Sequence, residues 1–427
     1  MPYIETGTGG HGASGQLDYT RSVVNIRYRW WILTLLTLAT TLNYLDRIAL
    51  TFLSIPIWKD LGLNEQSYSR AVFAFQIAYT VGFLIMGKFV DRFGSRIGYA
   101  TAAMWWAGAS MLHGFARSAF QLSAFRALLG LGEAGNFPSA IKAVAEWFPV
   151  KDRAFATGIF NAGTNMANVI GPPLFAYVSV RYGWRACFFI TSSLGMVFSV
   201  VWLFSYYTPK TVDAAGVEAP KEQPMPWMEA LRHKQTWGFA LGKFFSDPVW
   251  WFYLFWLPIY FYKVRGWSQD EMKWALPFIY IVADLGSVGG GWLSGYFIKR
   301  GWTVARARKT TLLICALCPP IAACGVLVPN PVWAVVLFSL ATAAHQGWSA
   351  NLYTTTSDVF PKRAVASVVG IGGAVGGLSG AVFSALVPGY VVPLFGYTPL
   401  FLTIGCFYLV GLYALHKLMG DLKPIEG

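Results

Sequence analysis

Charged side chains are scarce in this sequence of 427 residues, and their scarcity excludes an ordinary water-soluble domain. Asp, Glu, Lys and Arg together make up 12% of the chain, whereas a typical soluble domain has about 25%. Hydrophobic residues make up 55%. A membrane-crossing helix needs about 20 mostly apolar residues, so a chain of this length has room for roughly a dozen spans. Little sequence remains for a soluble enzyme domain.

The sequence also lacks the motifs that carry enzyme or metal chemistry. Its five cysteines lie in or beside apolar runs, and the CxxC of Cys315 and Cys318 has no second pair, so we expect packing residues. Gly82 to Lys88 resembles a phosphate-binding loop, but Phe89 stands where Ser or Thr is needed, at the end of a predicted span. No nucleophile motif or metal-ligand cluster is present. We therefore expect neither an enzyme nor a cofactor.

Apolar runs separated by turn or charge signals predict an all-α membrane protein with twelve transmembrane helices. The predicted spans are 30–56, 68–89, 97–115, 119–147, 154–179, 185–207, 237–262, 274–298, 310–328, 331–357, 364–388 and 394–416.

Polar segments at the ends and in the middle divide the chain into domains. The first residues are rich in Gly, Ser and Thr and resemble neither a signal peptide nor a span, so 1–28 is predicted as a disordered cytoplasmic tail. The longest polar break contains Pro220, Pro224 and Pro226. The predicted domains are a six-helix bundle at 29–207, a cytoplasmic linker at 208–236, a second six-helix bundle at 237–418 and a cytoplasmic tail at 419–427.

The net charge of +13 is explained by loops rather than by nucleic-acid binding, because the basic residues sit in short clusters between apolar runs. Loops on the cytoplasmic side of a membrane protein carry an excess of Lys and Arg. One set of loops is clearly the more basic, and includes Lys88, Arg92, Arg96, Lys299 and Arg300. That set is predicted to be cytoplasmic, and an even number of spans then places both termini inside.

The two halves of the chain resemble each other. Gly87-Lys88-Phe89-Val90-Asp91-Arg92-Phe93-Gly94 follows the second span, and Gly295-Tyr296-Phe297-Ile298-Lys299-Arg300-Gly301 follows the eighth. Glu146-Trp147-Phe148-Pro149 follows the fourth span, and Asp358-Val359-Phe360-Pro361 follows the tenth. Internal duplication around a central linker is typical of secondary transporters.

The first of these loops resembles the major facilitator superfamily. Its motif comprises Gly87, Asp91, Arg92, Gly94 and Arg96, which the resemblance assigns to architecture and gating. Physically, Gly87 and Gly94 permit close helix approach and a turn. Asp91 can cap a neighbouring helix N-terminus, and the arginines can form an ion-pair latch.

A narrower resemblance, over essentially the whole chain after the tail, is to the anion:cation symporter family and its bacterial hexuronate branch. It is carried by Asn43-Tyr44-Leu45-Asp46-Arg47, Arg126, Glu133, Asp247-Pro248-Val249-Trp250-Trp251, Ala283-Asp284-Leu285-Gly286 and Ala344-His345-Gln346. It implies the major facilitator fold, the inner membrane of a bacterium, and import of an organic anion, usually a sugar acid, with protons. The fold's default state is a monomer among membrane lipids.

Charges deep in a span are costly and generally functional. Asn43, Asp46 and Arg47 lie at i, i+3 and i+4, so we expect all three to face a central cavity. Arg47 is suited to clamp a carboxylate, because a guanidinium binds one bidentately and stays charged. Asp46 and Glu133 are predicted proton carriers, with Arg126 as the partner that pairs with one of them. A static ion pair that only ties helices together is the structural alternative.

Hydrogen-bonding and aromatic side chains in other spans are predicted to bind substrate. The predicted substrate-binding residues besides Arg47 are Tyr44, Gln76, Tyr79, Asn165, His345, Trp348 and Asn351. Asn161, Asn165 and Asn168 share one helical face, where amides suit either sugar hydroxyls or interhelical hydrogen bonds. A sugar ring would stack on Trp348. Asp247 is expected to pair with Lys243, and Asp284 is either a third proton site or a polar anchor.

The prediction is therefore proton symport of a sugar acid, most simply a hexuronate such as galacturonate or glucuronate. An aldonate or another carboxylated sugar fits the same clamp. The alternatives are an uncoupled facilitator or exchanger of organic anions on the same fold, and a transport-derived sensor without flux. Titratable Asp46 and Glu133 argue against the facilitator, and the sensor would need a signalling domain.

Overall fold

The computed structural model describes residues 3–6, 21–24, 26–209, 211–212, 223–267 and 269–425, and most of them are helical. The first half contains α1 (Ile26–Phe52), α2 (Ser54–Leu61), α3 (Glu65–His113), α4 (Ala119–Glu133), α5 (Asn136–Trp147), α6 (Val150–Tyr182) and α7 (Trp184–Ser205). The second half contains α9 (Lys234–Lys263), α10 (Gln269–Lys299), α11 (Val304–Ala323), α12 (Pro331–Val359), α13 (Val365–Gly380), α14 (Val387–Phe395), α15 (Thr398–Gly405) and α16 (Phe407–Met419). A short helix, α8 (Trp227–Arg232), precedes α9.

The twelve predicted spans are confirmed as helical segments within the described residues. Some boundaries differ. The range of α3 covers the second and third spans as two helices, which are separated by a kink at Gly94 with φ 78°, a conformation that glycine adopts without strain. The fourth span is divided into α4 and α5, and the eleventh passes from α13 through a π-helical stretch, Ala381–Leu386, into α14.

Six helical segments in the described part of the chain are long and apolar enough to cross a membrane by composition alone. They belong to α3, α7, α10, α11, α13 and the pair α15–α16. Helices α1, α6, α9 and α12 fall outside this set although each is longer than α7. These four carry Asp46, Asn161, Lys243 and His345, and polar residues inside a span mark functional helices.

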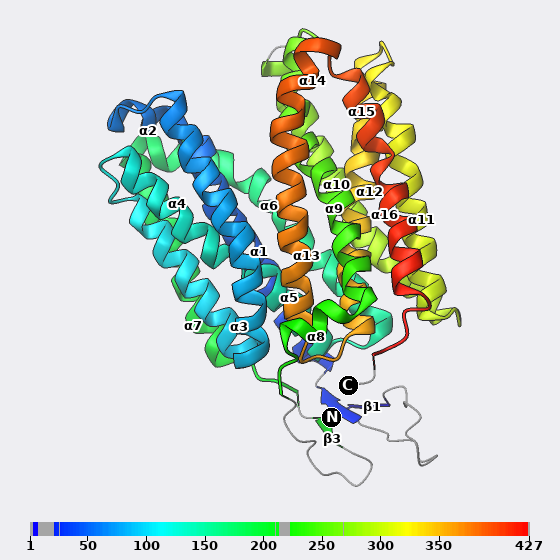
Figure 1. Cartoon of the computed structure of the whole chain (residues 1–427). Coiled ribbons are helices and arrows are strands. Elements are labelled where there is room, and N and C mark those ends of the chain that lie inside the picture. The colour runs from blue at the N-terminus through cyan, green and yellow to red at the C-terminus, as the bar shows by residue number, and fades with distance from the viewer. Residues whose placement is uncertain are drawn as a thin grey trace.

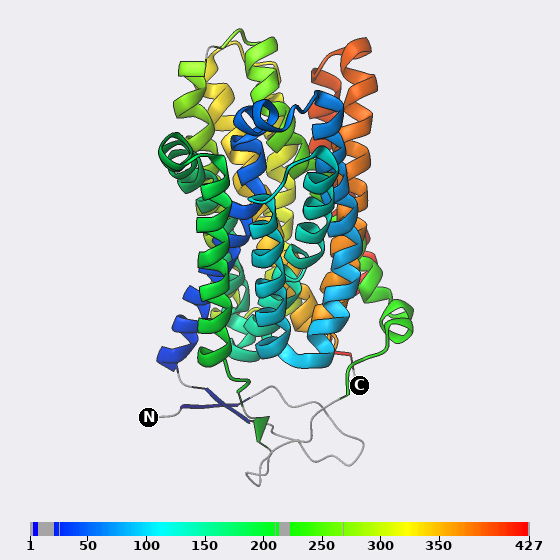
Figure 2. The same ribbon diagram turned by 90° about the vertical axis from the view of Figure 1, so that its left-hand side faces the viewer.

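The helices form two bundles, one from each half of the chain (Figure 1). Helices α3 and α6 of the first bundle pack against α13 and α10 of the second. The ribbons of the two bundles lie close together at the end where both termini lie and diverge toward the other end (Figure 1), and Figure 2 shows both termini at that same end. Both termini therefore lie at the end where the two halves meet.

Glycines allow this close contact between the halves. A side chain on Gly87 would meet the carbonyl oxygen of Ala366 at 2.5 Å, and one on Gly295 would meet that of Lys151 at 2.6 Å. These two glycines occupy matching places in the repeated loops. Close approach through small residues is the usual way that helices associate in lipid, where burial of apolar surface gives little driving force.

A small antiparallel sheet joins parts of the chain that the sequence predicted as tail and linker. Its strands are β1 (Tyr3–Thr6), β2 (Arg21–Val24) and β3 (Thr211–Val212), in that order. Ile4, opposite Val23, illustrates the β-branched residues that favour strands. This differs from the disorder predicted for 1–28, and α1 also starts within that range. Residues 7–20 and 213–222, including Pro220, lie outside the described residues.

Candidate functional site

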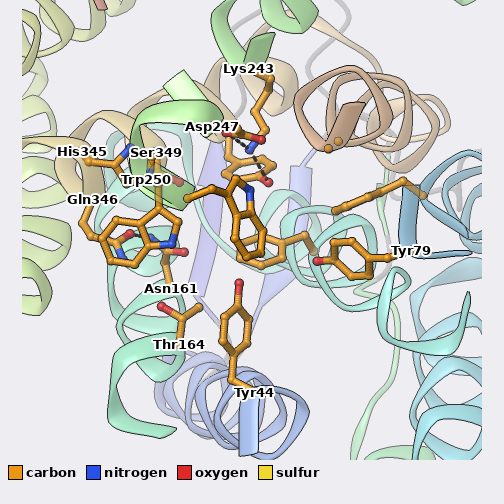
Figure 3. Close-up of a pocket in the computed structure, with 16 residues that line it drawn as sticks. Tyr44, Tyr79, Asn161, Thr164, Lys243, Asp247, Trp250, His345, Gln346 and Ser349 are labelled. Carbon is orange, nitrogen blue, oxygen red and sulfur yellow. Dashed lines mark hydrogen bonds and ion pairs between the residues drawn. The ribbon is translucent and has the colours of Figure 1, made fainter. Parts of the chain in front are cut away.

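A pocket lies between the two bundles (Figure 3). Its empty space is about 540 Å³, a volume that includes solvent open to the outside. Helices α1, α3, α5 and α6 line one side, and α9, α12 and α13 line the other. The lining residues are Tyr44, Tyr79, Phe83, Phe137, Asn161, Thr164, Lys243, Asp247, Trp250, Trp251, His345, Gln346, Ser349, Tyr353, Gly373 and Gly377.

The side of the pocket from the first half is formed by two tyrosines that cover Arg47. The Arg47 guanidinium lies 4.4 Å from the ring centres of both Tyr44 and Tyr79. Arg47 Nε donates a hydrogen bond to Glu133 Oε2 at 2.8 Å, and both residues are buried. Arg47 Nη1 and Nη2 and Glu133 Oε1 have no hydrogen-bond partner among the described residues. The pair is therefore only partly satisfied and lies directly behind the pocket wall.

Arg126 makes different contacts from the ion pair that its spacing suggested. It donates a hydrogen bond to the carbonyl oxygen of Arg47 at 3.4 Å, and its guanidinium lies 4.3 Å from the ring centre of Phe75. Within the described chain no ion pair joins it to Glu133 or Asp46. Arg47, rather than Arg126, forms the ion pair with Glu133.

Asp46 points away from the pocket, contrary to the expectation that it shares a face with Arg47. Its Oδ1 accepts hydrogen bonds from Ser110 at 2.7 Å and Thr191 at 2.6 Å, inside the first bundle. Consecutive helical residues are separated by about 100°. Helix α1 therefore directs Arg47 toward the pocket wall and Asp46 toward α3 and α7. Asn43, one turn before Asp46, is also fully buried.

The side from the second half carries an ion pair (Figure 3). Lys243 Nζ lies 2.8 Å from Asp247 Oδ1 and donates a hydrogen bond to the Tyr353 hydroxyl at 2.9 Å. The predicted pairing of Lys243 with Asp247 is confirmed. His345 stacks on Trp250 with ring centres 4.9 Å apart, and its Nδ1 lies 2.6 Å from the Tyr408 hydroxyl oxygen.

Four of the predicted substrate-binding residues lie outside the pocket lining, in addition to Arg47. Trp348 is fully buried and packs its ring against the edge of Tyr408. Asn351 donates hydrogen bonds at 2.9 Å to the carbonyl oxygens of Gly290 and Gly347, which ties α12 to α10. Asn165 donates to Asp284 Oδ1 at 2.7 Å across the two halves. Gln76 is half-buried on α3.

Several lining residues were not selected from the sequence. They include Lys243, Trp250, Trp251, Ser349 and Tyr353. The sequence did carry a signal for Lys243. A Lys and an Asp four residues apart inside one span indicate an ion pair, because an unpaired charge in the membrane is costly. Asn161 and Gln346 were noted as polar positions, and they line the pocket and hydrogen-bond to each other across the halves at 2.7 Å.

Asp91 of the repeated loop joins the two halves beyond the pocket. Its Oδ1 pairs with Lys142 at 2.7 Å, and its two oxygens accept hydrogen bonds from the backbone N–H groups of Ala366 and Ser367 at 3.3 and 2.6 Å. These N–H groups are the unpaired donors at the start of α13, so the predicted helix cap is confirmed.

The expected arginine latch of this motif has no counterpart in the described ion pairs. Arg92 lies over Phe93, and Arg96 donates to the carbonyl oxygen of Leu203 at 2.9 Å. Lys142 supplies the cation beside Asp91 instead.

The matching loop of the second half makes an equivalent contact with reversed charge. Lys299 occupies the place of Asp91, and its Nζ lies 3.0 Å from Asp152 Oδ1 in the first turn of α6. A cation cannot cap a helix N-terminus directly, and here Asp152 stands between Lys299 and that terminus. Nearby, Asp358 pairs with Arg308 at 2.9 Å and with Arg153 of the first half at 3.6 Å. Both repeats thus close the end of the molecule where the termini lie.

Comparisons with known proteins agree with this architecture. The model of the Major Facilitator Superfamily matches residues 36–384. A hexuronate transporter of Escherichia coli K12 is 32% identical over 93% of this chain and 95% of its own length. A galacturonate transporter of Dickeya chrysanthemi is 30% identical over 64% of this chain and 83% of its own length. The resemblance to the hexuronate branch is confirmed.

Solved structures show the same fold. A proton:xylose symporter of the superfamily, bound to 6-bromo-6-deoxy-D-glucose, superposes with a TM-score of 0.73 at 15% identity, over 93% of this chain and 97% of the other. The human organic anion transporter MFSD10 superposes with a TM-score of 0.65 at 16% identity, over 91% and 99% of the two chains. This chain therefore belongs to the Major Facilitator Superfamily and is a membrane transporter, not an enzyme.

Proposed function

We propose that this protein imports a sugar acid, most simply a hexuronate such as galacturonate or glucuronate, by proton symport. The observation that carries the proposal is the composition of the pocket between the halves. It combines one cation for a carboxylate, amides and hydroxyls for sugar hydroxyls, and aromatic rings for a sugar face. The relatives named for hexuronate and galacturonate transport support the same substrate class.

The proposed setting is the inner membrane of a bacterium, with the protein as a monomer and both termini in the cytoplasm. The domains at 29–207 and 237–418 would then move as the two rocking units, connected by 208–236. With this orientation the closed end faces the cytoplasm, so the state described above is outward-facing. Contacts of Asp91 with α13 and of Lys299 with Asp152 would hold that end shut.

Coupling is proposed to depend on the charged residues of α1 and α4. Glu133 would alternate between its ion pair with Arg47 and a protonated state, with Arg126 close by to favour proton release. Substrate would draw Arg47 toward the pocket between Tyr44 and Tyr79. Asp46, held by Ser110 and Thr191, would carry a proton inside the first bundle and sense movement of α3 and α7 against α1. The proton is the coupling ion, and no cofactor takes part.

The test is uptake of labelled galacturonate and glucuronate into proteoliposomes, with and without an inward proton gradient, for wild type and Asp46→Asn. We expect gradient-driven accumulation by wild type. In Asp46→Asn accumulation should vanish while downhill exchange survives, because the binding pocket is intact. Accumulation that ignores the gradient in both proteins would instead identify an uncoupled facilitator.

A second substrate class is favoured by one comparison. A D-galactonate transporter of Escherichia coli O6:H1 is 27% identical over 93% of this chain and 97% of its own length. An aldonate offers the same carboxylate and hydroxyls on an open chain. Competition of unlabelled galactonate against labelled galacturonate separates the two classes.

A further inference from the structure

The strongest unassigned feature of the pocket is its own charge pair. Among the described residues that line the pocket, the only cation is Lys243 and the only carboxylate is Asp247. Arg47 lies behind the rings of Tyr44 and Tyr79 and is held by Glu133. An anionic substrate entering the pocket therefore meets the Lys243 ammonium before it can reach the Arg47 guanidinium.

The Lys243 ammonium is already oriented toward the pocket. It is fixed by two contacts, with Asp247 Oδ1 at 2.8 Å and with the Tyr353 hydroxyl at 2.9 Å, and it lies 4.5 Å from the centre of the Tyr353 ring. An ammonium has three N–H donors. A substrate carboxylate could take the place of Asp247 while the tyrosine contact persists.

Helix α13 presents glycines to Asp247. A side chain on Gly376 would collide with Asp247 Oδ2, and one on Gly380 would meet Trp251 at 2.7 Å. The glycine face therefore makes room for the carboxylate but offers it no side-chain donor. Among the described residues, its other side-chain hydrogen-bond partner is the Ser246 hydroxyl, at 3.4 Å. If Lys243 turns to a substrate, Asp247 is left as a poorly solvated anion beside a second anion.

The other groups that face this pair do not remove that excess of negative charge. They are tyrosines and one histidine: Tyr353 and His345 on α12, Tyr408 on α16, and Tyr79 on α3 beyond Tyr353. The positive charge of Arg47 on α1 also interacts electrostatically with Tyr353, but the Glu133 carboxylate balances that charge. The pair is neutral when the pocket is empty and would carry one net negative charge with a monocarboxylate bound.

We propose that Lys243 is the carboxylate-binding residue of the second half, and that Asp247 takes up one proton when a substrate carboxylate displaces it. This inference rests on the proposed transport of sugar acids. The proton comes from the solution to which the pocket opens and binds one Asp247 oxygen, and no bond of the substrate changes. When substrate leaves on the other side, the proton leaves with it and the pair forms again. Asp247 thereby adds a proton site to those on α1 and α4.

The experiment measures binding and proton uptake on the purified full-length protein. Galacturonate, glucuronate and galactonate are titrated by calorimetry in buffers of different ionisation enthalpy, which yields both Kd and the number of protons bound per substrate. The variants are Lys243→Gln, Lys243→Arg, Asp247→Asn and the double variant Lys243→Gln/Asp247→Asn. Lys263→Gln, at the exposed end of the same helix, is the matched control.

We expect Lys243→Gln and the double variant to bind roughly 10- to 100-fold more weakly, as for loss of one charged hydrogen bond. Lys243→Arg should keep most of the affinity. Asp247→Asn should bind at least as tightly as wild type and take up one proton fewer per substrate. The double variant leaves no lone charge, so it tests the binding claim even if Lys243→Gln does not fold.

Different failures have different meanings. Wild type that binds none of the three sugar acids would overturn the proposed function and this inference together. Wild type that binds them, with the Lys243 variants within twofold of its Kd, would overturn this inference alone. If Asp247→Asn takes up as many protons per substrate as wild type, Asp247 is not the residue that binds the proton.

Discussion

The backbone N–H of Ser367 donates a hydrogen bond of 2.6 Å to Asp91 Oδ2, and this bond joins the second half of the molecule to the first. Asp91 lies just after the second span, and Ser367 lies in the first turn of α13. The same carboxylate pairs with Lys142 at 2.7 Å. One side chain thus holds α3, α5 and α13 together where the halves are closed, and it must release α13 when they separate.

Asp91→Asn should therefore weaken the closed state of this end. Asparagine keeps one acceptor for an N–H group but loses the charge that favours both Lys142 and the α13 N-terminus, which is worth about 1–3 kcal/mol. We expect faster labelling of a Ser357→Cys reporter, buried at the same end, by a polar maleimide in proteoliposomes. Asp421→Asn, an exposed carboxylate at this end, is the control. Equal labelling rates in both variants would contradict the role of Asp91.

Removal of Arg47 alone should destabilise the protein more than removal of Arg47 and Glu133 together. Arg47→Met leaves the Glu133 carboxylate buried without a cation, and breaking a buried pair costs about 3–5 kcal/mol. In Arg47→Met/Glu133→Gln no buried charge remains, so part of that loss should be recovered. Thermal unfolding in detergent measures both. A double variant no more stable than the single one would mean that Glu133 is held by other groups.

Gly376→Ala should impair substrate binding, whereas Gly289→Ala should not. A methyl group on Gly376 would displace the Asp247 carboxylate from α13 and so disturb the pair with Lys243. Overpacking of this kind typically costs about 1–3 kcal/mol. Gly289 lies in helix α10 with open space around its Cα, so alanine there should be neutral or slightly stabilising. The Kd for galacturonate and the melting temperature of the two variants provide the comparison.

The sequence predicted the spans and the pairing of Lys243 with Asp247, because each depends on local spacing. It predicted the capping role of Asp91 from the loop motif, but not that the capped helix is α13 of the other half. It did not predict the direction of Asp46. In lipid both the outer surface and the interior of a bundle are apolar, so a polar triplet such as Asn43, Asp46 and Arg47 shows that a face is buried but not which helix covers it. For the same reason the sequence selected Trp348 as a substrate-binding residue, whereas Trp250 lines the pocket in the structure.

The contacts of Asp284 distinguish between the two roles that the sequence left open for it. The sequence left it as either a proton site or a polar anchor. In the structure its Oδ1 accepts a hydrogen bond of 2.7 Å from Asn165 Nδ2, which connects α10 to α6 of the other half, and it lies outside the pocket lining. No cation pairs with it in the described part of the chain. This geometry favours the anchor.

Asp284→Asn should therefore transport almost normally, because asparagine retains a carbonyl oxygen that accepts the same hydrogen bond. Asp284→Ala should leave Asn165 Nδ2 without a partner, at a cost of about 1–3 kcal/mol to the state in which the halves are joined. We expect the proton-driven accumulation ratio of galacturonate in Asp284→Asn to equal that of wild type, and the rate in Asp284→Ala to fall several-fold. If Asp284→Asn instead exchanges substrate freely but no longer accumulates it, Asp284 carries a coupled proton and the anchor role is wrong.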